Sequence, residues 1–264
     1  MPDLATLQSL DGKVAIVTGG GGLLGPEFGA ALAEQGAAVA LVDLVQEKAE
    51  AAARSLVAAF GGNILGISAD IGEPDSVATM VGRVLAEFGR IDVLINGAAG
   101  RPPGFFAPFE DYALSDWDQV LSANLTGTFL CCQAVGRHMK EHGGGSIINT
   151  SSVYGVVSPD QRVYEGSSIN TPAAYSASKA GVIGLTKYLS TYWASDKIRV
   201  NAITPGGVFN HQDSVFVRQY ERRTPMGRMA WAHELRGAVA FLASDMSSYV
   251  TGHNLIVDGG WTVW

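Results

Sequence analysis

The stretch KVAIVTGGGGLLG at residues 13–25 decides the fold. It opens with a short apolar run, continues through four glycines, and leads into a helix-like segment at residues 24–35. Glycine lets the backbone turn tightly and approach a ligand, while the N-terminus of the following helix offers free N–H groups and a positive dipole. The order of strand, glycine turn and helix predicts a dinucleotide-binding unit, although a purely structural tight turn would use the same residues.

The alternation of strand and helix continues outward from this unit. Further strands are predicted at residues 38–43, 63–69, 91–95, 146–150, 198–203 and 254–257, with helices at residues 46–60, 73–88, 116–141 and 173–194. Unbroken apolar runs of this kind are typical of parallel strands covered on both faces. We therefore expect an α/β fold, a Rossmann-like doubly wound parallel sheet of about seven strands. No linker or repeat divides the chain, so residues 1–264 are expected to form a single domain.

Composition excludes several classes of partner. The chain has a net charge of −7 and no stripe of Lys and Arg, so nucleic acid is not an expected partner. No apolar run reaches the roughly 18 residues of a membrane helix, and the N-terminus lacks the basic and apolar regions of a secretory signal. The two cysteines, Cys131 and Cys132, are adjacent and can form neither a disulfide framework nor a zinc site. We expect buried thiols, no metal, and a cytoplasmic location.

The second predicted strand ends in Asp43. A carboxylate at this position can bind both ribose hydroxyls of the adenosine half of a dinucleotide, whereas it would repel a 2′-phosphate. The next cation along the chain is Lys48, and none lies within the glycine turn. This pattern favours NAD over NADP, although Asp43 is also a common type of residue for a turn at a strand end.

A second group of residues indicates catalysis. Tyr175 and Lys179 are four residues apart in a predicted helix, so their side chains share one face. Such a spacing arises readily by chance, but here Ser151 and Ser152 follow the fifth strand and Asn124 lies in the preceding long helix. The combination predicts a site in which a phenol, an ammonium and a hydroxyl act together.

With these residues in place, the chain resembles the short-chain dehydrogenase/reductase family, in its shorter single-domain branch, over essentially its whole length. The shared motifs are the segments 18–25, 96–99 and 257–260, together with Asp70, Asn124, Ser152, Tyr175, Lys179, Pro205 and Gly206. The resemblance implies one Rossmann-type domain that binds NAD and carries out hydride transfer. Cofactor contacts would come from Gly19, Gly22, Leu23, Leu24, Gly25, Asp43, Asp70, Ile71, Asn96, Gly97, Ala98, Tyr175, Lys179, Pro205, Gly206 and Val208.

The resemblance also implies the catalytic roles. Tyr175 would be the general acid/base, and a free phenol titrates near pH 10, too high for proton transfer at neutral pH. Lys179 and the oxidised nicotinamide would lower the pKa of Tyr175, and Lys179 would hold the nicotinamide ribose. Ser152 would bind the substrate oxygen, and Asn124 would hold a water through its backbone.

Simpler interpretations of these residues stay open. Ser151 can take the place of Ser152, and Asn124 can bond its own helix backbone. Asp70 can cap the following helix instead of contacting adenine.

The chain departs from the family pattern at three places. Leu23 replaces a usual glycine, and the spacing of Gly19, Gly22 and Gly25 matches the longer, epimerase-type branch. A sugar-nucleotide epimerase or dehydratase with tightly bound NAD is therefore an alternative. The segment 96–99 reads Asn-Gly-Ala-Ala rather than Asn-Asn-Ala-Gly. Finally, Ser152 and Tyr175 are 23 residues apart, so residues 156–171 form an insertion that either lines the substrate pocket or contacts another subunit.

Substrate choice is expected to come from loops at residues 100–115, 156–171 and 206–223. Candidate pocket residues are Arg101, Arg162, Tyr164 and His211, with Asp160 and Gln161 beside them. The arginines favour an anionic hydroxy-substrate such as a sugar acid, with other sugars or a lipophilic cyclic alcohol as alternatives. In the family, helices corresponding to residues 113–141 and 173–194 pair between subunits. That correspondence predicts a homo-oligomer, a homotetramer or a dimer.

Overall fold

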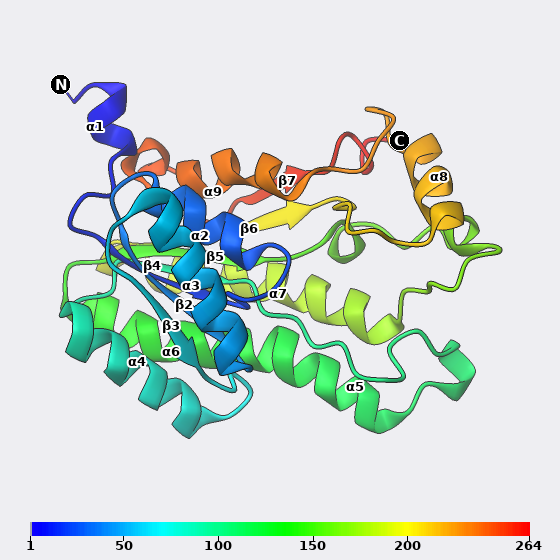
Figure 1. Ribbon diagram of the computed structural model, residues 1–264, viewed down its shortest axis with the longest axis horizontal. Helices are drawn as coiled ribbons and strands as arrows, with labels where there is room; N and C mark the ends of the chain where they lie inside the picture. The colour runs from blue at the N-terminus through cyan, green and yellow to red at the C-terminus, as the bar shows by residue number, and fades with distance from the viewer. Residues whose placement is uncertain (1) are drawn as a thin grey trace.

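A parallel sheet of seven strands runs through the centre of the structure, a computed structural model that describes residues 2–264 (Figure 1). The spatial order is β3-β2-β1-β4-β5-β6-β7. The strands are β1 (Val14–Thr18), β2 (Ala38–Asp43), β3 (Ile64–Ser68), β4 (Val93–Asn96), β5 (Gly145–Thr150), β6 (Ile198–Pro205) and β7 (Asn254–Val257). The expected Rossmann-like doubly wound sheet is confirmed. The strand order reverses between β1 and β4, where such folds bind their ligands.

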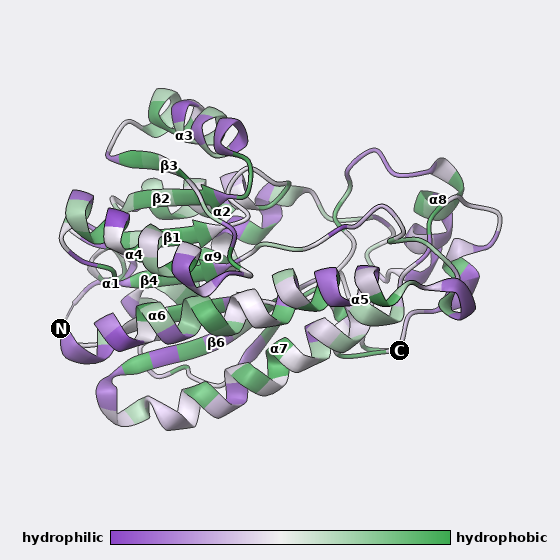
Figure 2. Cartoon of the chain, turned by 90° about the horizontal axis from the view of Figure 1, so that it is seen from below, coloured by the Kyte–Doolittle hydropathy of each residue, from purple (hydrophilic) through white to green (hydrophobic). Residues whose placement is uncertain are grey.

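Helices cover both faces of the sheet. Figure 1 places α9 and α2 on one side, and α4 and α6 on the other. The longer helices are α2 (Gly25–Ala33), α3 (Gln46–Phe60), α4 (Pro74–Phe88), α5 (Leu114–Leu121), α6 (Gly127–Glu141), α7 (Ala173–Tyr192), α8 (Ser214–Arg223) and α9 (Arg236–Ala243). Figure 2 shows largely hydrophobic strands between helices that carry both hydrophobic and hydrophilic residues. This is the burial pattern of a sheet enclosed on both faces.

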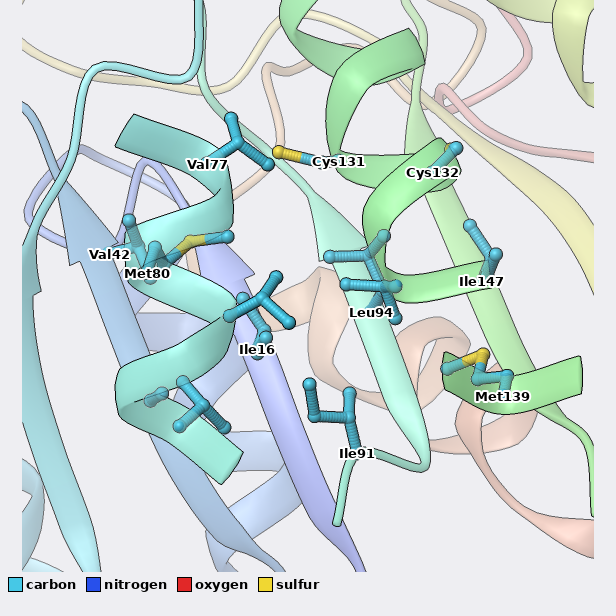
Figure 3. Packing of buried hydrophobic residues seen from close by; sticks show 14 of the residues in the cluster. Ile16, Val42, Val77, Met80, Ile91, Leu94, Cys131, Cys132, Met139 and Ile147 are labelled. Atoms are coloured by element: carbon cyan, nitrogen blue, oxygen red, sulfur yellow. The ribbon is translucent and has the colours of Figure 1, made fainter. Parts of the chain in front are cut away.

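The core consists of two apolar clusters, one on each face of the sheet. In the cluster of Figure 3, Ile16, Leu94 and Ile147 of the strands pack with residues of α4, α6 and α7. Each of these three side chains is fully buried, which stabilises the fold by roughly 1.5–3 kcal/mol relative to exposure. Cys131 and Cys132 belong to the same cluster. Burial raises the pKa of Cys131 to about 12, so this thiol is an apolar packing group at neutral pH.

The long helix predicted at residues 116–141 is interrupted. A π-helical turn, Ser122–Thr126, separates α5 from α6, and the Gly127 N–H bonds the Ser122 carbonyl five residues earlier. Such a turn inserts one residue without breaking the helix axis, so the apolar periodicity of the sequence does not reveal it. Asn124 lies within this turn.

Three helices were absent from the sequence prediction: α1 (Leu4–Gln8), α8 and α9. Helix α8 begins after Asp213, whose carboxylate accepts the N–H groups of Val215 and Phe216. It lies beyond the edge of the sheet near the C-terminus (Figure 1). Its Phe216 and Tyr220 form a third apolar cluster with Tyr164 and Trp261. The 156–171 insertion and the tail of the chain therefore pack on α8 of the same chain.

A bilayer-crossing helix is absent from residues 2–264. Because all the strands are parallel, their carboxyl ends lie along one edge of the sheet. The glycine turn after β1, Asp43 at the end of β2 and Ser152 after β5 therefore share that edge.

Candidate active site

The glycine turn after β1 brings backbone close to backbone. Gly19 has a φ of +70°, and a Cβ built on it would lie 2.8 Å from the Ala98 Cα. A Cβ at Gly25 would overlap the Gly19 carbonyl oxygen. Helix α2 begins at Gly25 with no side chain capping its first N–H groups. The turn thus offers uncapped N–H donors and no obstructing side chain, which fits the pyrophosphate of a dinucleotide.

Asp43 faces this turn from the end of β2. Its Oδ2 accepts the Gly21 N–H at 3.0 Å, and its Oδ1 accepts the Val45 N–H at 3.1 Å. The carboxylate therefore also organises the backbone of the strand end. It remains partly exposed, so it keeps oxygen lone pairs available for ribose hydroxyls.

Thr18, the last residue of β1, links the turn after β4 to the glycine turn. The Thr18 Oγ1 accepts the Gly97 N–H at 3.1 Å and the Ala98 N–H at 3.4 Å. Next to it, the Asn96 Nδ2 donates to the Asn149 Oδ1 at 2.8 Å. The buried Asn96 Oδ1 has no partner within residues 2–264. Asn96 therefore braces β4 against β5.

Asp70 and Ile71 lie just after β3. Asp70 is exposed and its Oδ1 accepts the Gly72 N–H at 2.9 Å, while the N-cap of α4 is Glu73. Asp70 thus closes a short turn and does not cap the helix. Ile71 is buried, and a Cβ at Gly127 would lie 2.7 Å from its side chain.

A cavity of about 440 Å³ lies at the carboxyl ends of the strands. It is lined both by residues of the glycine turn and by the catalytic candidates. Residues from the predicted set that line it are Leu23, Leu24, Gly97, Arg101, Ser152, Tyr164, Tyr175, Lys179, Pro205, Gly206 and Val208. Those that lie outside the lining are Gly19, Gly22, Gly25, Asp43, Asp70, Ile71, Asn96, Ala98, Asn124, Arg162 and His211. One crevice therefore joins the glycine turn to the phenol and the ammonium.

Tyr175 and Lys179 project from the first turns of α7 into this cavity. The Lys179 Nζ lies 5.7 Å from the Tyr175 ring centroid and donates to the Thr150 carbonyl at 2.8 Å. Burial lowers the pKa of Lys179 to about 8.

The pKa of Tyr175 is raised by burial, while a hydrogen bond to Ser152 and the positive charge of Arg101 act in the lowering direction. Without a bound ligand, Lys179 does not contribute to lowering the pKa of Tyr175, contrary to expectation. The ammonium is itself desolvated, and its hydrogen bond goes to the Thr150 carbonyl instead.

The two serines after β5 have different environments. The Ser151 Oγ donates to the Lys179 carbonyl at 2.9 Å, so it ties β5 to α7. The Ser152 Oγ accepts the Tyr154 N–H at 3.2 Å, and its hydroxyl acts on the pKa of Tyr175 in the lowering direction. This geometry favours Ser152 as the hydroxyl beside the phenol.

Asn124 is fixed from both sides. Its Oδ1 accepts the Gly100 N–H at 2.8 Å, and its Nδ2 donates to the Ser178 Oγ at 3.0 Å. The side chain therefore links the π-helical turn to the loop after β4 and to α7, rather than bonding its own helix. Its carbonyl accepts the Thr128 hydroxyl at 2.8 Å.

Two of the predicted substrate residues lie outside the cavity lining. Arg162 is exposed and paired with Asp160 at 2.8 Å, outside the cavity lining. His211 is exposed with a φ of 54°, and its ring packs 5.2 Å from Phe209. The sequence pattern alone does not indicate that Arg162 pairs with Asp160 and lies outside the cavity.

Other lining residues were not singled out as substrate contacts. Tyr154 precedes the insertion and Thr171 is its last residue. Tyr220 of α8 also lines the cavity, and its ring stacks on Trp261 with 4.0 Å between ring centroids. A usable signal existed for Tyr154, because it follows Ser152 by two residues and so lies near it. Within residues 2–264, no group of three or more His, Cys, Asp or Glu side chains is arranged to hold a metal.

Comparisons with known proteins agree over nearly the whole chain. Residues 24–262 match a family model described as enoyl-(acyl carrier protein) reductase. The D-threitol dehydrogenase of Mycolicibacterium smegmatis is 41% identical over 96% of this chain and 94% of that protein. The cis-4-hydroxycyclohexanecarboxylate dehydrogenase of Sinomonas cyclohexanicum is 39% identical over 95% of this chain and 96% of that protein.

Among solved structures, a gluconate 5-dehydrogenase from Burkholderia cenocepacia, in complex with NADP and tartrate, is similar to this chain. The TM-score is 0.87 and the sequence identity 34%, with 99% of this chain and 100% of that chain covered.

Proposed function

This chain belongs to the short-chain dehydrogenase/reductase family, and on that premise we propose that it transfers a hydride between NAD and a secondary alcohol or ketone. The substrate would be a sugar, a polyol or a related polar hydroxy compound. The observation that carries the proposal is that Ser152, Tyr175 and Lys179 line the same cavity as Leu24 of the glycine turn.

Tyr175 is the proposed general acid/base. In alcohol oxidation its phenolate takes the hydroxyl proton, and in ketone reduction its phenol returns that proton. The bound nicotinamide supplies or accepts the hydride. Ser152, which lines the same cavity as Tyr175, would bind the same substrate oxygen and stabilise the charge that develops on it.

Lys179 has two proposed roles. With a pKa of about 8, it is mostly charged at neutral pH and can stabilise the phenolate form of Tyr175 once a substrate and a cofactor exclude water. It would also bind the nicotinamide ribose hydroxyls. Its existing bond to the Thr150 carbonyl fixes the direction of the ammonium.

NAD is the proposed cofactor because Asp43 places a carboxylate beside the glycine turn. The neighbouring Leu44 and Val45 are uncharged, and the nearest cation along the chain is Lys48, whose backbone packs against Gly21 of the glycine turn. The gluconate 5-dehydrogenase structure contains NADP, so the preference is specific to the residues of this chain.

The relatives that this chain matches along almost their full length are named dehydrogenases, which favours net oxidation over an epimerase with tightly held NAD. The test is a screen of the purified protein with NAD⁺ against polyols, sugars, sugar acids and cyclic alcohols. We expect NADH to form in proportion to the alcohol consumed. Product without accumulation of NADH would favour the epimerase instead.

A homo-oligomer is also proposed. A groove between α6 and α7 exposes Phe129, Tyr188 and Tyr192, the last two with about 60% of their surface accessible. Exposed aromatic patches of this kind mark interfaces between proteins. Light scattering of the purified protein tests this, with a dimer or a tetramer expected and a monomer contradicting it.

A further inference from the structure

The insertion at residues 156–171 builds a chain of hydroxyl groups inside the cavity. Tyr164, in the middle of the insertion, bonds the Tyr154 hydroxyl at 2.6 Å and also bonds the Thr171 Oγ1. Tyr154 follows Ser152 by two residues, and Thr171 precedes Tyr175 by four. Tyr164 therefore connects the two ends of the insertion, each of which leads directly into a catalytic candidate.

This hydroxyl chain has unused hydrogen-bonding capacity. Three hydroxyl groups are joined by two hydrogen bonds, so one hydroxyl hydrogen is left without an acceptor whichever way the hydrogens point. No other side-chain or backbone partner of these hydroxyls occurs within the part of the chain that is described. All three residues line the cavity. A ligand that enters it meets a free O–H donor together with oxygen lone pairs.

The hydroxyls are fixed in position and uncharged. Tyr164 is buried with only 8% of its surface accessible, and its ring stacks on Phe216 with 5.4 Å between centroids. Burial raises the pKa of both Tyr154 and Tyr164, so neither ionises near neutral pH. A preorganised group that both donates and accepts can satisfy both the O–H and the oxygen lone pairs of an alcohol.

Two cations and no carboxylate line the cavity within residues 2–264. Arg162 and Arg223 both pair with Asp160, at 2.8 and 2.6 Å, and lie outside the lining. Apart from Lys179, Arg101 is the one cation that lines the cavity within residues 2–264. Its guanidinium sits over the rings of Phe105 and Phe106, at 5.4 and 5.3 Å.

We propose that Tyr154, Tyr164 and Thr171 form a subsite for a second hydroxyl of the substrate, so that the substrate carries at least two hydroxyl groups. This inference rests on the proposed function and specifies it. The group oxidised would lie at Ser152 and Tyr175, while a hydroxyl farther along the same molecule bonds the subsite. A mono-alcohol would leave the subsite hydroxyl without a partner, so we expect a lower kcat/KM for a mono-alcohol.

The test compares three substrates of equal carbon number with NAD⁺: butane-1,2,3,4-tetrol, 2-butanol and the four-carbon aldonate. For the wild-type protein we expect kcat/KM to be higher for the tetrol and the aldonate, which both carry several hydroxyls, than for 2-butanol. In Tyr164→Phe and Thr171→Val, the ratio of kcat/KM for the tetrol to that for 2-butanol should fall about tenfold or more. Tyr249→Phe, an exposed tyrosine outside the cavity and outside the groove between α6 and α7, is the matched control and should keep the wild-type ratio.

The outcomes separate the subsite from the reaction itself. If 2-butanol is as good a substrate as the tetrol, or if both variants lose tetrol and 2-butanol activity in equal proportion, the subsite is wrong. NADH binding measured by fluorescence must stay unchanged in the variants, since a folding defect would weaken it as well. If the wild-type protein forms no NADH from any substrate of the panel, the proposed function itself fails.

Discussion

The Lys179 ammonium donates to the carbonyl oxygen of Thr150, with 2.8 Å between the two atoms. Thr150 is the last residue of β5, and Ser152 follows two residues later, so the bond ties the catalytic face of α7 to the strand that carries the serine. The relative placement of the phenol, the ammonium and the hydroxyl is therefore fixed by the fold before any ligand binds. Such preorganisation is what proton transfer and charge stabilisation require.

Lys179→Met is expected to change how stability depends on pH. The folded-state pKa of about 8 lies below the usual value of lysine, so between about pH 8 and pH 10 the unfolded state binds more protons. The free energy of unfolding of the wild type therefore increases relative to that of the variant as pH rises through this window, by an amount on the order of 3 kcal/mol. Urea unfolding of both proteins at several pH values measures this. Lys187→Met, an exposed lysine on the same helix, is the control and should show no such trend.

Asp43→Asn is expected to weaken the preference for NAD. The substitution keeps the shape of the side chain but removes the charge beside the Gly21 N–H. We expect the ratio of kcat/KM with NAD⁺ to that with NADP⁺ to fall about 10- to 100-fold, because repulsion of the 2′-phosphate is lost. Asp118→Asn, on the exposed surface of α5, should leave the ratio unchanged. An unaltered ratio in Asp43→Asn would mean that this carboxylate only organises the strand end.

Arg101→Met is expected to shift the pH profile of alcohol oxidation to higher pH. Oxidation needs the deprotonated form of Tyr175, and the positive charge of Arg101 lowers the pKa of that phenol. Without this charge, kcat/KM rises at higher pH than in the wild type. High salt should reduce the difference between the two pH profiles, because Arg101 is exposed and its charge is screened. In Arg162→Met, which removes a charge already paired with Asp160, the profile should stay in place. A shift toward lower pH in Arg101→Met would contradict the assignment.

Asn124→Ala is expected to destabilise the fold by about 1–3 kcal/mol. The substitution leaves the Gly100 N–H and the Ser178 hydroxyl without their present partner in a buried region. Ser122→Ala, in the same π-helical turn, should stay within about 0.5 kcal/mol of the wild type. Thermal and urea unfolding test this, and equal stability of the two variants would show that the Asn124 bonds are replaced by water.

Much of the fold is predictable from the sequence because buried parallel strands are short apolar runs. The local sequence pattern alone predicts the strand that ends at Thr18 and the position of Asp43 at the end of the next strand. The π-helical turn around Asn124 does not, because a one-residue insertion in a helix leaves the apolar face continuous. The position of Arg162 also depends on an ion pair with Asp160 and on the packing of the insertion against α8. The packing against α8 is a long-range contact and has no local signature in the sequence.

The measurement that tests the account most directly is alcohol oxidation by Tyr175→Phe. The substitution removes one hydroxyl from a side chain whose ring packs 6.1 Å from Phe105, so folding and NADH binding should be retained. We predict a loss of kcat of about 10²- to 10⁴-fold with the best substrate of the panel, because the proton acceptor is gone. Activity equal to that of the wild type, with the fold and NADH binding intact, would contradict the assignment of Tyr175 as the general acid/base.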